Sequence, residues 1–271
     1  MLIEKMHGCG NDFCVFSYEK GIDYSNLAIK LCNRKTGIGS DGMIVVKTNP
    51  LEMLFYNSDG SRAPMCGNGI RCFSKYALEH NLVKRSKFDV LTGAGKLTIE
   101  VTQEEPFMCK VNMGSPIFNN SVIRVSDGLD CFGRVINVDD LNITVYSFFM
   151  GTIHTVIFVD SFEDEILKHA LNISKHKLFN ECTNVNFVKI IDKHKIKVKT
   201  FERGVYDWTL ACGTGCCASV VCANKLGLCY QNVEVELELG SLEIEIKKNQ
   251  VFMTGPAIKV FECEIEEDKL C

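Results

Sequence analysis

Residues 65–72 read Met65-Cys66-Gly67-Asn68-Gly69-Ile70-Arg71-Cys72, and residues 211–217 read Ala211-Cys212-Gly213-Thr214-Gly215-Cys216-Cys217. Both stretches contain Cys-Gly-x-Gly, and both run directly into a pattern that is typical of a helix. A cysteine at such a helix start lies among backbone N–H groups without intrahelical partners, at the positive end of the macrodipole. That position lowers the pKa of a thiol, and the same N–H groups can hold a carboxylate. The two stretches therefore predict two-base chemistry on a carboxylic acid.

This chemistry requires bases at the α-carbon and hydrogen-bond donors at the carboxylate. Removing the α-proton of an amino acid without a cofactor needs a base in contact with it and hydrogen-bond donors around the carboxylate that takes up charge. Inversion needs one base on each face of the α-carbon. With each sulfur about 3–3.5 Å from that carbon, the two sulfurs would be roughly 7 Å apart. Cysteine suits the task because its pKa can be moved near the working pH.

Composition sets the class of protein. The chain has 271 residues, of which 46% are hydrophobic and 24% charged, which is ordinary for a globular protein with room for two lobes. The net charge of -4 gives no basic face for nucleic acid. No apolar run approaches the ~18 residues that would span a membrane. Fifteen cysteines without a recognisable signal peptide indicate reduced thiols in the cytoplasm.

The order of predicted elements repeats in the two halves. Each half has two strands around a polar loop, a helix, a strand pair and the Cys-Gly-x-Gly helix. The polar loops are His7–Asp12 and Met150–His154, and the helices before the strand pairs cover residues 26–33 and 162–171. The predicted domains are an N-terminal lobe, residues 1–115, to which a tail of residues 262–271 returns, and a C-terminal lobe, residues 116–261. Two similar lobes would turn their glycine-rich helix starts toward a common cleft, where ligands often bind.

Six stretches in this order make the sequence recognisable, and they cover nearly its whole length. They are residues 6–13 (Met-His-Gly-Cys-Gly-Asn-Asp-Phe), 57–61 (Asn-Ser-Asp-Gly-Ser), 65–72, 111–114 (Val-Asn-Met-Gly), 183–188 (Thr-Asn-Val-Asn-Phe-Val), and 202–204 (Glu-Arg-Gly) leading to 211–215. The sequence resembles the diaminopimelate epimerase family. The resemblance implies an α+β fold of two pseudo-symmetric lobes, each a barrel-like, mostly antiparallel sheet wrapped around a central helix.

The resemblance also implies the activity. It implies an isomerase that inverts an amino-acid α-carbon without pyridoxal phosphate, converting LL-diaminopimelate to meso-diaminopimelate for lysine and cell-wall synthesis. No cofactor and no metal ion are expected. The expected partners are a small amino-acid substrate and a second copy of the chain in a homodimer, with neither nucleic acid nor a membrane.

The site residues implied by the resemblance fall into three groups. Cys66 and Cys212 match the two bases, and His154 and Glu202 match a pair thought to adjust the pKa values of the thiols. Positions that bind the α-carboxylate are matched by Gly67, Asn68, Gly213 and Thr214. Other substrate contacts are implied for Asn11, Asn57, Asn184, Arg203 and, where the family usually has an amide, Thr152.

Some positions depart from the family pattern. The family usually reads Gly-Asn-Pro-His where this chain has Gly-Thr152-Ile153-His154, and Tyr206 and Trp208 stand where many members carry Glu or Gly. These departures keep a racemase of another amino acid, such as histidine, as the main alternative.

Alternatives from other classes are weaker. A thiol-based zinc or redox protein would need a second close cysteine pair besides Cys212 and Cys216. Nucleotide binding at the glycine-rich loop of residues 37–42 would need a helix after the loop, whereas a strand is predicted there.

Overall fold

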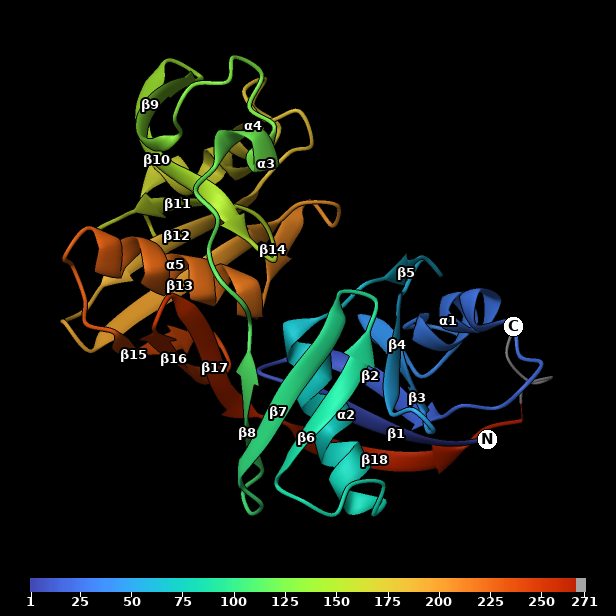
Figure 1. Ribbon diagram of the computed structural model, residues 1–271. Helices are drawn as coiled ribbons and strands as arrows, with labels where there is room; N and C mark the ends of the chain where they lie inside the picture. Colours follow the sequence, from blue (N-terminus) through green and yellow to red (C-terminus); the bar gives the residue numbers. More distant parts are fainter. Residues whose placement is uncertain (267–271) are drawn as a thin grey trace. The chain divides into compact units, whose positions relative to one another are not determined.

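The computed structural model describes residues 1–266. The chain forms two compact units: Met1–Val111 with the residues from Thr254 onward, and Asn112–Met253 (Figure 1). The units change at Val111 and Met253, whereas the expected boundaries lie at residues 115 and 261. Residues 262–266 of the expected tail belong to the first unit, and residues 267–271 lie outside the described residues.

The first unit contains two helices and most of its strands in the first 112 residues. Its elements are β1 (Leu2–Gly8), β2 (Asn11–Ser17), α1 (Tyr24–Cys32), β3 (Gly42–Lys47), β4 (Glu52–Asn57), β5 (Arg62–Ala63), α2 (Gly67–Glu79), β6 (Lys87–Thr92), β7 (Gly95–Gln103), β8 (Met108–Asn112) and β18 (Ile258–Glu264). Strand β17 (Gln250–Pro256) contains the second change of unit.

The second unit has its helices between strands in the same manner. Its elements are α3 (Asn120–Ile123), β9 (Phe132–Val138), β10 (Leu141–Met150), β11 (Thr152–Phe158), the 3-10 helix η1 (Glu165–His169), α4 (Ala170–Ser174), β12 (Asn184–Ile190), β13 (Lys195–Glu202), β14 (Asp207–Thr209), α5 (Gly213–Lys225), β15 (Asn232–Leu237) and β16 (Gly240–Lys247).

The two units share one topology. In the first unit β1 and β2 pair antiparallel, β2 and β3 parallel, β3 and β4 antiparallel, β4 and β6 parallel, and β6 and β7 antiparallel. The second unit repeats this series with β10, β11, β12, β13, β15 and β16. Short strands β5 and β14 precede α2 and α5. The internal repeat that the sequence predicts is therefore present in the order and direction of the strands.

Helices α2 and α5 are the central helices of their units. A helix that is buried all round belongs to a core rather than to a surface, and α2 is buried from Gly67 to Ser74. In α5 every residue from Gly215 to Ala223 is buried. Helix α2 contacts β1 to β4, and α5 contacts β10 to β13, β15 and β16. The predicted fold class, α+β with sheets wrapped around a central helix, is confirmed.

Period-2 patterns place the strands correctly at the end of the second unit. Val233, Val235 and Leu237 of β15 are buried and their neighbours are exposed or half-buried. Leu242 and Ile244 of β16 are buried in the same way. Alternate side chains of a strand point to opposite faces of a sheet. The alternation of apolar and acidic residues over 233–246 predicts this hairpin, and the structure confirms it, with its apolar face on the core.

The two predicted polar loops are in fact tight hairpins. Gly8 pairs with Asn11 across Cys9 and Gly10, which both have positive φ, as a two-residue hairpin turn requires. In the second unit Met150 pairs with Thr152 across Gly151 alone, whose φ is +72°. The helix predicted over residues 162–171 is also corrected, because η1 and α4 occupy only Glu165–Ser174.

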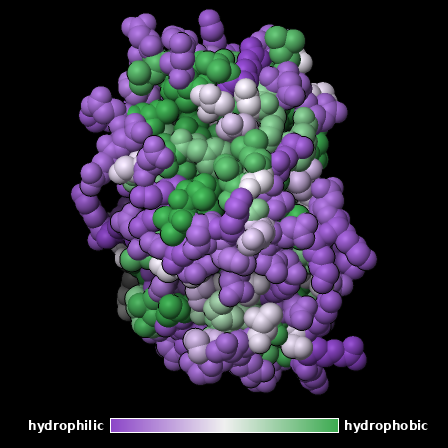
Figure 2. Space-filling view, turned by 90° about the vertical axis from the view of Figure 1, so that its left-hand side faces the viewer, coloured by the Kyte–Doolittle hydropathy of each residue, from purple (hydrophilic) through white to green (hydrophobic). Residues whose placement is uncertain are grey.

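Some large apolar side chains remain exposed. They include Leu129 and Val135 in the second unit and Val260 and Phe261 in the first. Figure 2 shows apolar areas among polar ones on one face of the molecule. None of the helices within residues 1–266 combines the length and the apolar character needed to cross a membrane.

Arg71 fixes the start of α2. Its side chain is fully buried, and it donates hydrogen bonds to the carbonyl oxygens of Gly67 and Pro256 at 3.1 and 3.0 Å and to Asn68 Oδ1 at 3.1 Å. Gly8 leaves the space that the guanidinium needs, because a Cβ there would lie 2.6 Å from Arg71 Nη2. Arg71 thus holds the first turn of α2, where Cys66 lies, against the β1–β2 hairpin.

We expect Arg71→Met to lower the free energy of unfolding by about 3 kcal/mol or more, because it leaves several buried acceptors without their charged donor. Chemical denaturation followed by circular dichroism measures this. The matched control is Arg62→Met, since the Arg62 side chain is 54% exposed and lies 3.8 Å from Glu52. The control should change stability by less than about 0.5 kcal/mol, and equal effects of both substitutions would contradict the role given to Arg71.

Candidate functional site

Cys66 caps the N-terminus of α2. Its backbone is extended, with φ −133° and ψ 125°, and its Sγ accepts a hydrogen bond from the Gly69 N–H at 3.4 Å. Gly69 leaves room for this approach, because a Cβ there would lie 3.3 Å from Cys66 Cβ and 3.7 Å from Cys66 Sγ. A hydrogen-bond donor aimed at sulfur favours the charged form of a thiol. The sequence prediction that Cys66 begins this helix is confirmed.

The Asn11 amide is the second neighbour of Cys66. Asn11 Oδ1 accepts hydrogen bonds from Asn68 Nδ2 at 3.1 Å and from Cys66 Sγ at 3.7 Å. Asn11 Nδ2 donates to Asp41 Oδ2 at 2.6 Å. Because a carboxylate only accepts, Asp41 fixes which end of the amide faces the sulfur. The structure thus brings three predicted site residues, Asn11, Cys66 and Asn68, into one contact group.

Asp41 is held by a network of charges. Arg34 donates to Asp41 Oδ1 at 2.8 Å and to Asp12 Oδ1 at 2.9 Å, and Lys5 Nζ lies 2.7 Å from Asp12 Oδ2. These partners lower the pKa of Asp12 to about 2, against the effect of its burial, which is the largest influence and acts in the opposite direction. The network keeps the Asp12 carboxylate charged and the Asn11 amide in one orientation.

Asn57 ends β4 at the same edge of the sheet. Phe13 pairs with Gly42, and Gly42 pairs with Asn57, so the ends of three strands lie in one row. Asn57 Nδ2 donates to Ser61 Oγ at 2.9 Å, and its backbone closes the turn to β5. Asn57 therefore lies at the same strand ends as Asn11 and Asp41.

In the second unit Cys212 occupies the N-cap position of α5 that Cys66 occupies in α2, although only Cys66 accepts a capping hydrogen bond through its side chain. It has φ −123° and ψ 102°, and its Sγ lies 3.6 Å from Thr214 Oγ1. Gly213 follows it as the first, buried residue of α5. The turn between β10 and β11 reaches this helix start, because a Cβ on Gly151 would lie 3.2 Å from Thr214 Cγ2. Cys212, Thr214 and the residue before Thr152 are therefore neighbours.

His154 lies in strand β11 and not in the predicted loop. The single-residue turn at Gly151 starts the strand at Thr152, so His154 is its third residue and is fully buried. Asn186 Nδ2 and His154 Nδ1 are 3.1 Å apart. Burial, aided by the positive charge of Arg203, lowers the pKa of His154 to about 3. The imidazole is therefore neutral at physiological pH.

Asn184 joins β11 to the turn that carries Arg203. Its Nδ2 donates to the Ile153 carbonyl at 3.2 Å, and its Oδ1 accepts from the Arg203 backbone N–H at 2.9 Å. Arg203 Nη1 donates to the carbonyl oxygens of Glu181 and Cys182 at 3.0 and 3.4 Å. In this structure Asn184 thus positions Arg203.

Glu202, Tyr206 and Trp208 surround the same turn. Glu202 is the last residue of β13, and its carbonyl accepts from the Tyr206 N–H at 2.8 Å. Tyr206 is 40% exposed and lies under Lys175 Nζ, which is 4.2 Å from its ring centroid. The Trp208 ring packs on the core, with its centroid 5.7 Å from that of Phe187. Of the departures from the family pattern here, only Tyr206 presents its ring to solvent.

The sequence analysis did not single out Asp41, Asn186 and Thr200. Asn186 Oδ1 accepts from Thr200 Oγ1 at 3.0 Å, and Asp41 orients Asn11. The available signal was the polar character of Asn186 and Thr200 at positions that alternation assigns to the buried face of their strands. A polar side chain that is buried in a strand requires a partner.

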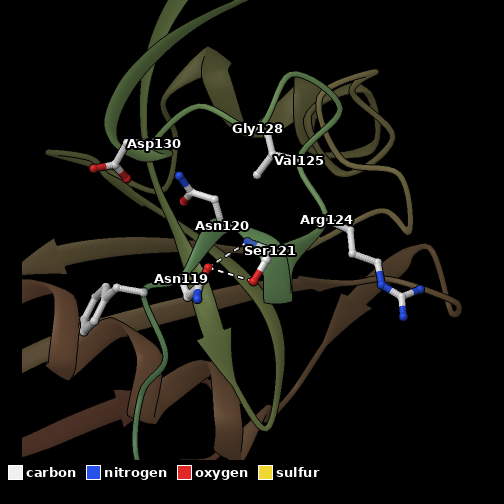
Figure 3. A pocket seen from close by; sticks show the side chains of 8 residues that line it. Asn119, Asn120, Ser121, Arg124, Val125, Gly128 and Asp130 are labelled. Atoms are coloured by element: carbon white, nitrogen blue, oxygen red, sulfur yellow. Dashed lines mark hydrogen bonds between the residues drawn. The ribbon is translucent and has the colours of Figure 1, made fainter.

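The second unit also contains a pocket away from these residues. A pocket of about 540 Å³ in the second unit is lined by Phe118, Asn119, Asn120, Ser121, Arg124, Val125, Gly128 and Asp130 (Figure 3). In Figure 3 Asn119 Oδ1 accepts from both the N–H and the hydroxyl of Ser121. None of the predicted site residues lines this pocket. Within residues 1–266 no three His, Cys, Asp or Glu side chains are grouped in a way that could hold a metal ion.

Comparison with known proteins gives a consistent result. The model of the family described as diaminopimelate epimerase matches residues 3–119 and 146–260. The chain is 43% identical to a diaminopimelate epimerase of Caldanaerobacter subterraneus subsp. tengcongensis, over 98% of this chain and 100% of the relative. It is 41% identical to a diaminopimelate epimerase of Clostridium perfringens, over 95% of this chain and 96% of the relative.

A solved structure agrees in fold. A PhzF-family phenazine biosynthesis protein of Bacillus anthracis superimposes with a TM-score of 0.73, covering 98% of this chain and 99% of that chain at 14% identity. Identity this low supports the fold alone. The family model and the two relatives, which match nearly the whole chain, show that this chain belongs to the diaminopimelate epimerase family.

Proposed function

We propose that this protein is a cofactor-independent isomerase that converts LL-diaminopimelate to meso-diaminopimelate with Cys66 and Cys212 as its two bases. One observation carries the proposal: in two units of the same topology, a cysteine occupies the same N-cap position of the central helix. The proposal requires the two sulfurs to act on opposite faces of one α-carbon.

The proposed reaction conserves the substrate's atoms. One cysteine acts as thiolate and takes the α-proton, while the electron pair of the broken C–H bond moves into the carboxylate. The other cysteine acts as thiol and delivers its proton to the opposite face of the same carbon, so that the configuration inverts. The thiolate and thiol have then exchanged roles, which allows the reverse reaction with the other epimer.

The α-carboxylate would be held at the helix starts. The first N–H groups of a helix have no intrahelical partner, and here they belong to Gly67 and Asn68 in α2 and to Gly213 and Thr214 in α5. The lack of a side chain on Gly67 and Gly213 lets an anion approach the backbone. Donors that are fixed before the reaction stabilise the charge that develops on the carboxylate.

The distal end of the substrate is assigned to Arg203 with Asn57, Asn184 and Thr152. A guanidinium can bind a carboxylate through two parallel hydrogen bonds. Arg203 is held by Asn184 through its backbone N–H, which supports a defined place for the guanidinium. The Thr152 hydroxyl is buried and has no hydrogen-bond partner in the described part of the chain. An acceptor or donor on the substrate would satisfy it.

The neutral charge of His154 limits the role that we propose for it. His154 is neutral, so the proposal gives it no charge with which to lower the pKa of a thiol. A neutral imidazole can still donate one hydrogen bond. Glu202 ends β13 beside Arg203, and its proposed role remains the one that the family resemblance implies, to adjust the pKa of a catalytic thiol.

The expected homodimer and cytoplasmic location are part of the proposal. Ile258, Val260 and Phe261 of β18 are exposed, and β18 pairs with β1, whose Leu2 is also exposed. A second copy of the chain could cover these apolar side chains. The fifteen cysteines fit a reducing compartment.

Loss of either base should stop inversion. We expect Cys66→Ser and Cys212→Ser each to lower the rate of epimerisation by ~10²–10⁴-fold, because each face of the α-carbon loses its acid–base group. The remaining cysteine should still exchange the α-proton of one epimer with solvent. Deuterium incorporation into LL- and meso-diaminopimelate, with the stereochemistry of the product, measures both. Cys263→Ser is the control, since Cys263 lies in β18, and near wild-type inversion by either active-site variant would exclude the two-base mechanism.

Arg203→Met should lower kcat/KM for meso-diaminopimelate by ~10²-fold or more, because a site built for a carboxylate is left without its charged donor. Thr152→Asn, which adds an amide, should leave kcat/KM equal or higher. The control is Arg124→Met. Arg124 pairs with the Glu181 carboxylate, while Arg203 donates to the Glu181 carbonyl, so both arginines contact the same residue. The control variant should retain activity.

Measuring kcat/KM for both meso-diaminopimelate and L-histidine decides between the two candidate substrates. A wild-type protein that turns over L-histidine and ignores diaminopimelate would overturn the substrate assignment and leave the two-cysteine chemistry in place.

Phe261→Glu should shift the protein from dimer to monomer, because it places a charge in the apolar area on β18. Sedimentation equilibrium of wild type and variant measures this. Leu129→Glu, at an exposed apolar residue of the second unit, is the control. A monomeric wild-type protein would contradict the homodimer.

A further inference from the structure

A row of buried polar side chains lies beside the start of α5. His154 and Asn186 are fully buried and Thr200 is 2% exposed. Asn186 pairs with Thr200 in the β12–β13 ladder, and Val156, two residues after His154, pairs with Asn186 in the β11–β12 ladder. The three side chains therefore lie on one face of the sheet, because alternate residues of a strand share a face.

The Asn186 amide has one possible orientation. Its side chain is 3.2 Å from the Thr155 carbonyl oxygen, which can only accept a hydrogen bond, so the atom there must be the Nδ2 donor. Its other end, Oδ1, accepts from Thr200 Oγ1 at 3.0 Å. The same Nδ2 lies 3.1 Å from His154 Nδ1. Thus Asn186 presents an N–H to the imidazole.

A donor facing Nδ1 decides which nitrogen of His154 carries the proton. Nδ1 must be the acceptor, so the single proton of the neutral ring is on Nε2. His154 Nε2 is buried, and no hydrogen-bond partner for it exists among residues 1–266. A buried N–H without a partner costs free energy. An acceptor that arrives with the substrate or forms during the reaction would satisfy it.

Cys212 lies beside the Asn186–Thr200 pair. A Cβ added to Gly215 would lie 3.2 Å from Cys212 Sγ and 3.1 Å from Thr200 Oγ1, and it would overlap Asn186 Oδ1. The absence of a side chain at residue 215 therefore lets the first turn of α5 rest directly on the Asn186–Thr200 pair. The polar row supports the sulfur-bearing turn as well as the imidazole.

We propose that Asn186, locked by Thr200 and the Thr155 carbonyl, is a positioning residue that holds His154 as the neutral Nε2–H tautomer, so that Nε2–H donates to an anionic acceptor at Cys212. The acceptor is either the Cys212 thiolate or a carboxylate of the bound substrate. A neutral donor stabilises such an anion without placing a full positive charge beside one thiol. The donor role, but not the tautomer, rests on the function proposed above.

The tautomer is tested by nitrogen NMR of protein carrying labelled histidine. The chain has six histidines, and His154→Gln identifies the resonance of His154. We expect the wild type to show a protonated Nε2 and an unprotonated Nδ1 from pH 5 to 9. A protonated Nδ1 in the wild type would overturn the proposal, whatever the enzymatic activity.

Asn186→Asp reverses the hydrogen bond, because a carboxylate only accepts. Nδ1 of His154 should then carry a proton. We expect kcat for diaminopimelate to fall by ~10–100-fold, as when a hydrogen-bond partner that orients a functional histidine is lost. The change in KM should be smaller. Thr200→Val removes only the support of the amide and should act in the same direction, more weakly. Asn137→Asp is the matched control, since Asn137 pairs with Asn142 on an exposed hairpin.

Two further readouts separate the possible outcomes. If Asn186→Asp fails to fold, the wild-type tautomer and Thr200→Val still decide the case. If the acceptor is a carboxylate of the substrate, the Nε2–H resonance should move when meso-diaminopimelate is added. If the acceptor is the Cys212 thiolate, the resonance should differ between the wild type and Cys212→Ser. No movement in either comparison would overturn the donor role. A wild type with the expected tautomer and no epimerase activity would count against the proposed function alone.

Discussion

A helix start enclosed by a sheet is the constraint on which both units depend. The first N–H groups of a helix need partners, and in α2 and α5 these groups lie inside the unit, next to a cysteine. The enclosure is possible because glycines follow each cysteine: a Cβ at Gly69 or Gly215 would press on Ile44 or on Asn186 and Thr200. The same lack of side chains that permits the packing leaves the backbone open to an anion, so one feature serves both the fold and the proposed chemistry.

The repeated topology carries different polar side chains at corresponding places. The second strand of each unit begins with Asn11 in one and Thr152 in the other, and the fourth strand ends with Asn57 or Glu202. An epimerase must invert one end of its substrate and only hold the distal end, so identical halves would not serve it. The backbone repeat supplies two equivalent thiols, while the divergent strand ends give each unit its own contacts.

Sequence reasoning succeeded where the signal was local. The Cys-Gly-x-Gly stretches predicted both helix starts, and alternation predicted the β15–β16 hairpin. It failed for His154, because Gly151, Thr152 and His154 together look like a loop, although a single glycine with positive φ is enough to turn the chain. The partners Asp41 and Asn186 depend on contacts across 30 and 32 residues, which no local pattern records. Trp208, one of the departures from the family pattern, packs its ring on the core.

The neutral state of His154 fits the demands of a two-base reaction. The proton must be able to end on either sulfur, so a difference of one unit between the two thiol pKa values adds about 1.36 kcal/mol to one direction. A protonated histidine beside one cysteine would create such a difference. Burial keeps His154 neutral, and Asn186 leaves its remaining proton on Nε2. In the first unit the Asn11 amide, also neutral, contacts Cys66. In the second unit the neutral Thr214 hydroxyl lies 3.6 Å from Cys212 Sγ. Each sulfur thus has a neutral polar side chain from its own unit as a neighbour, whereas the charged groups Asp41 and Arg203 act on Asn11 and His154.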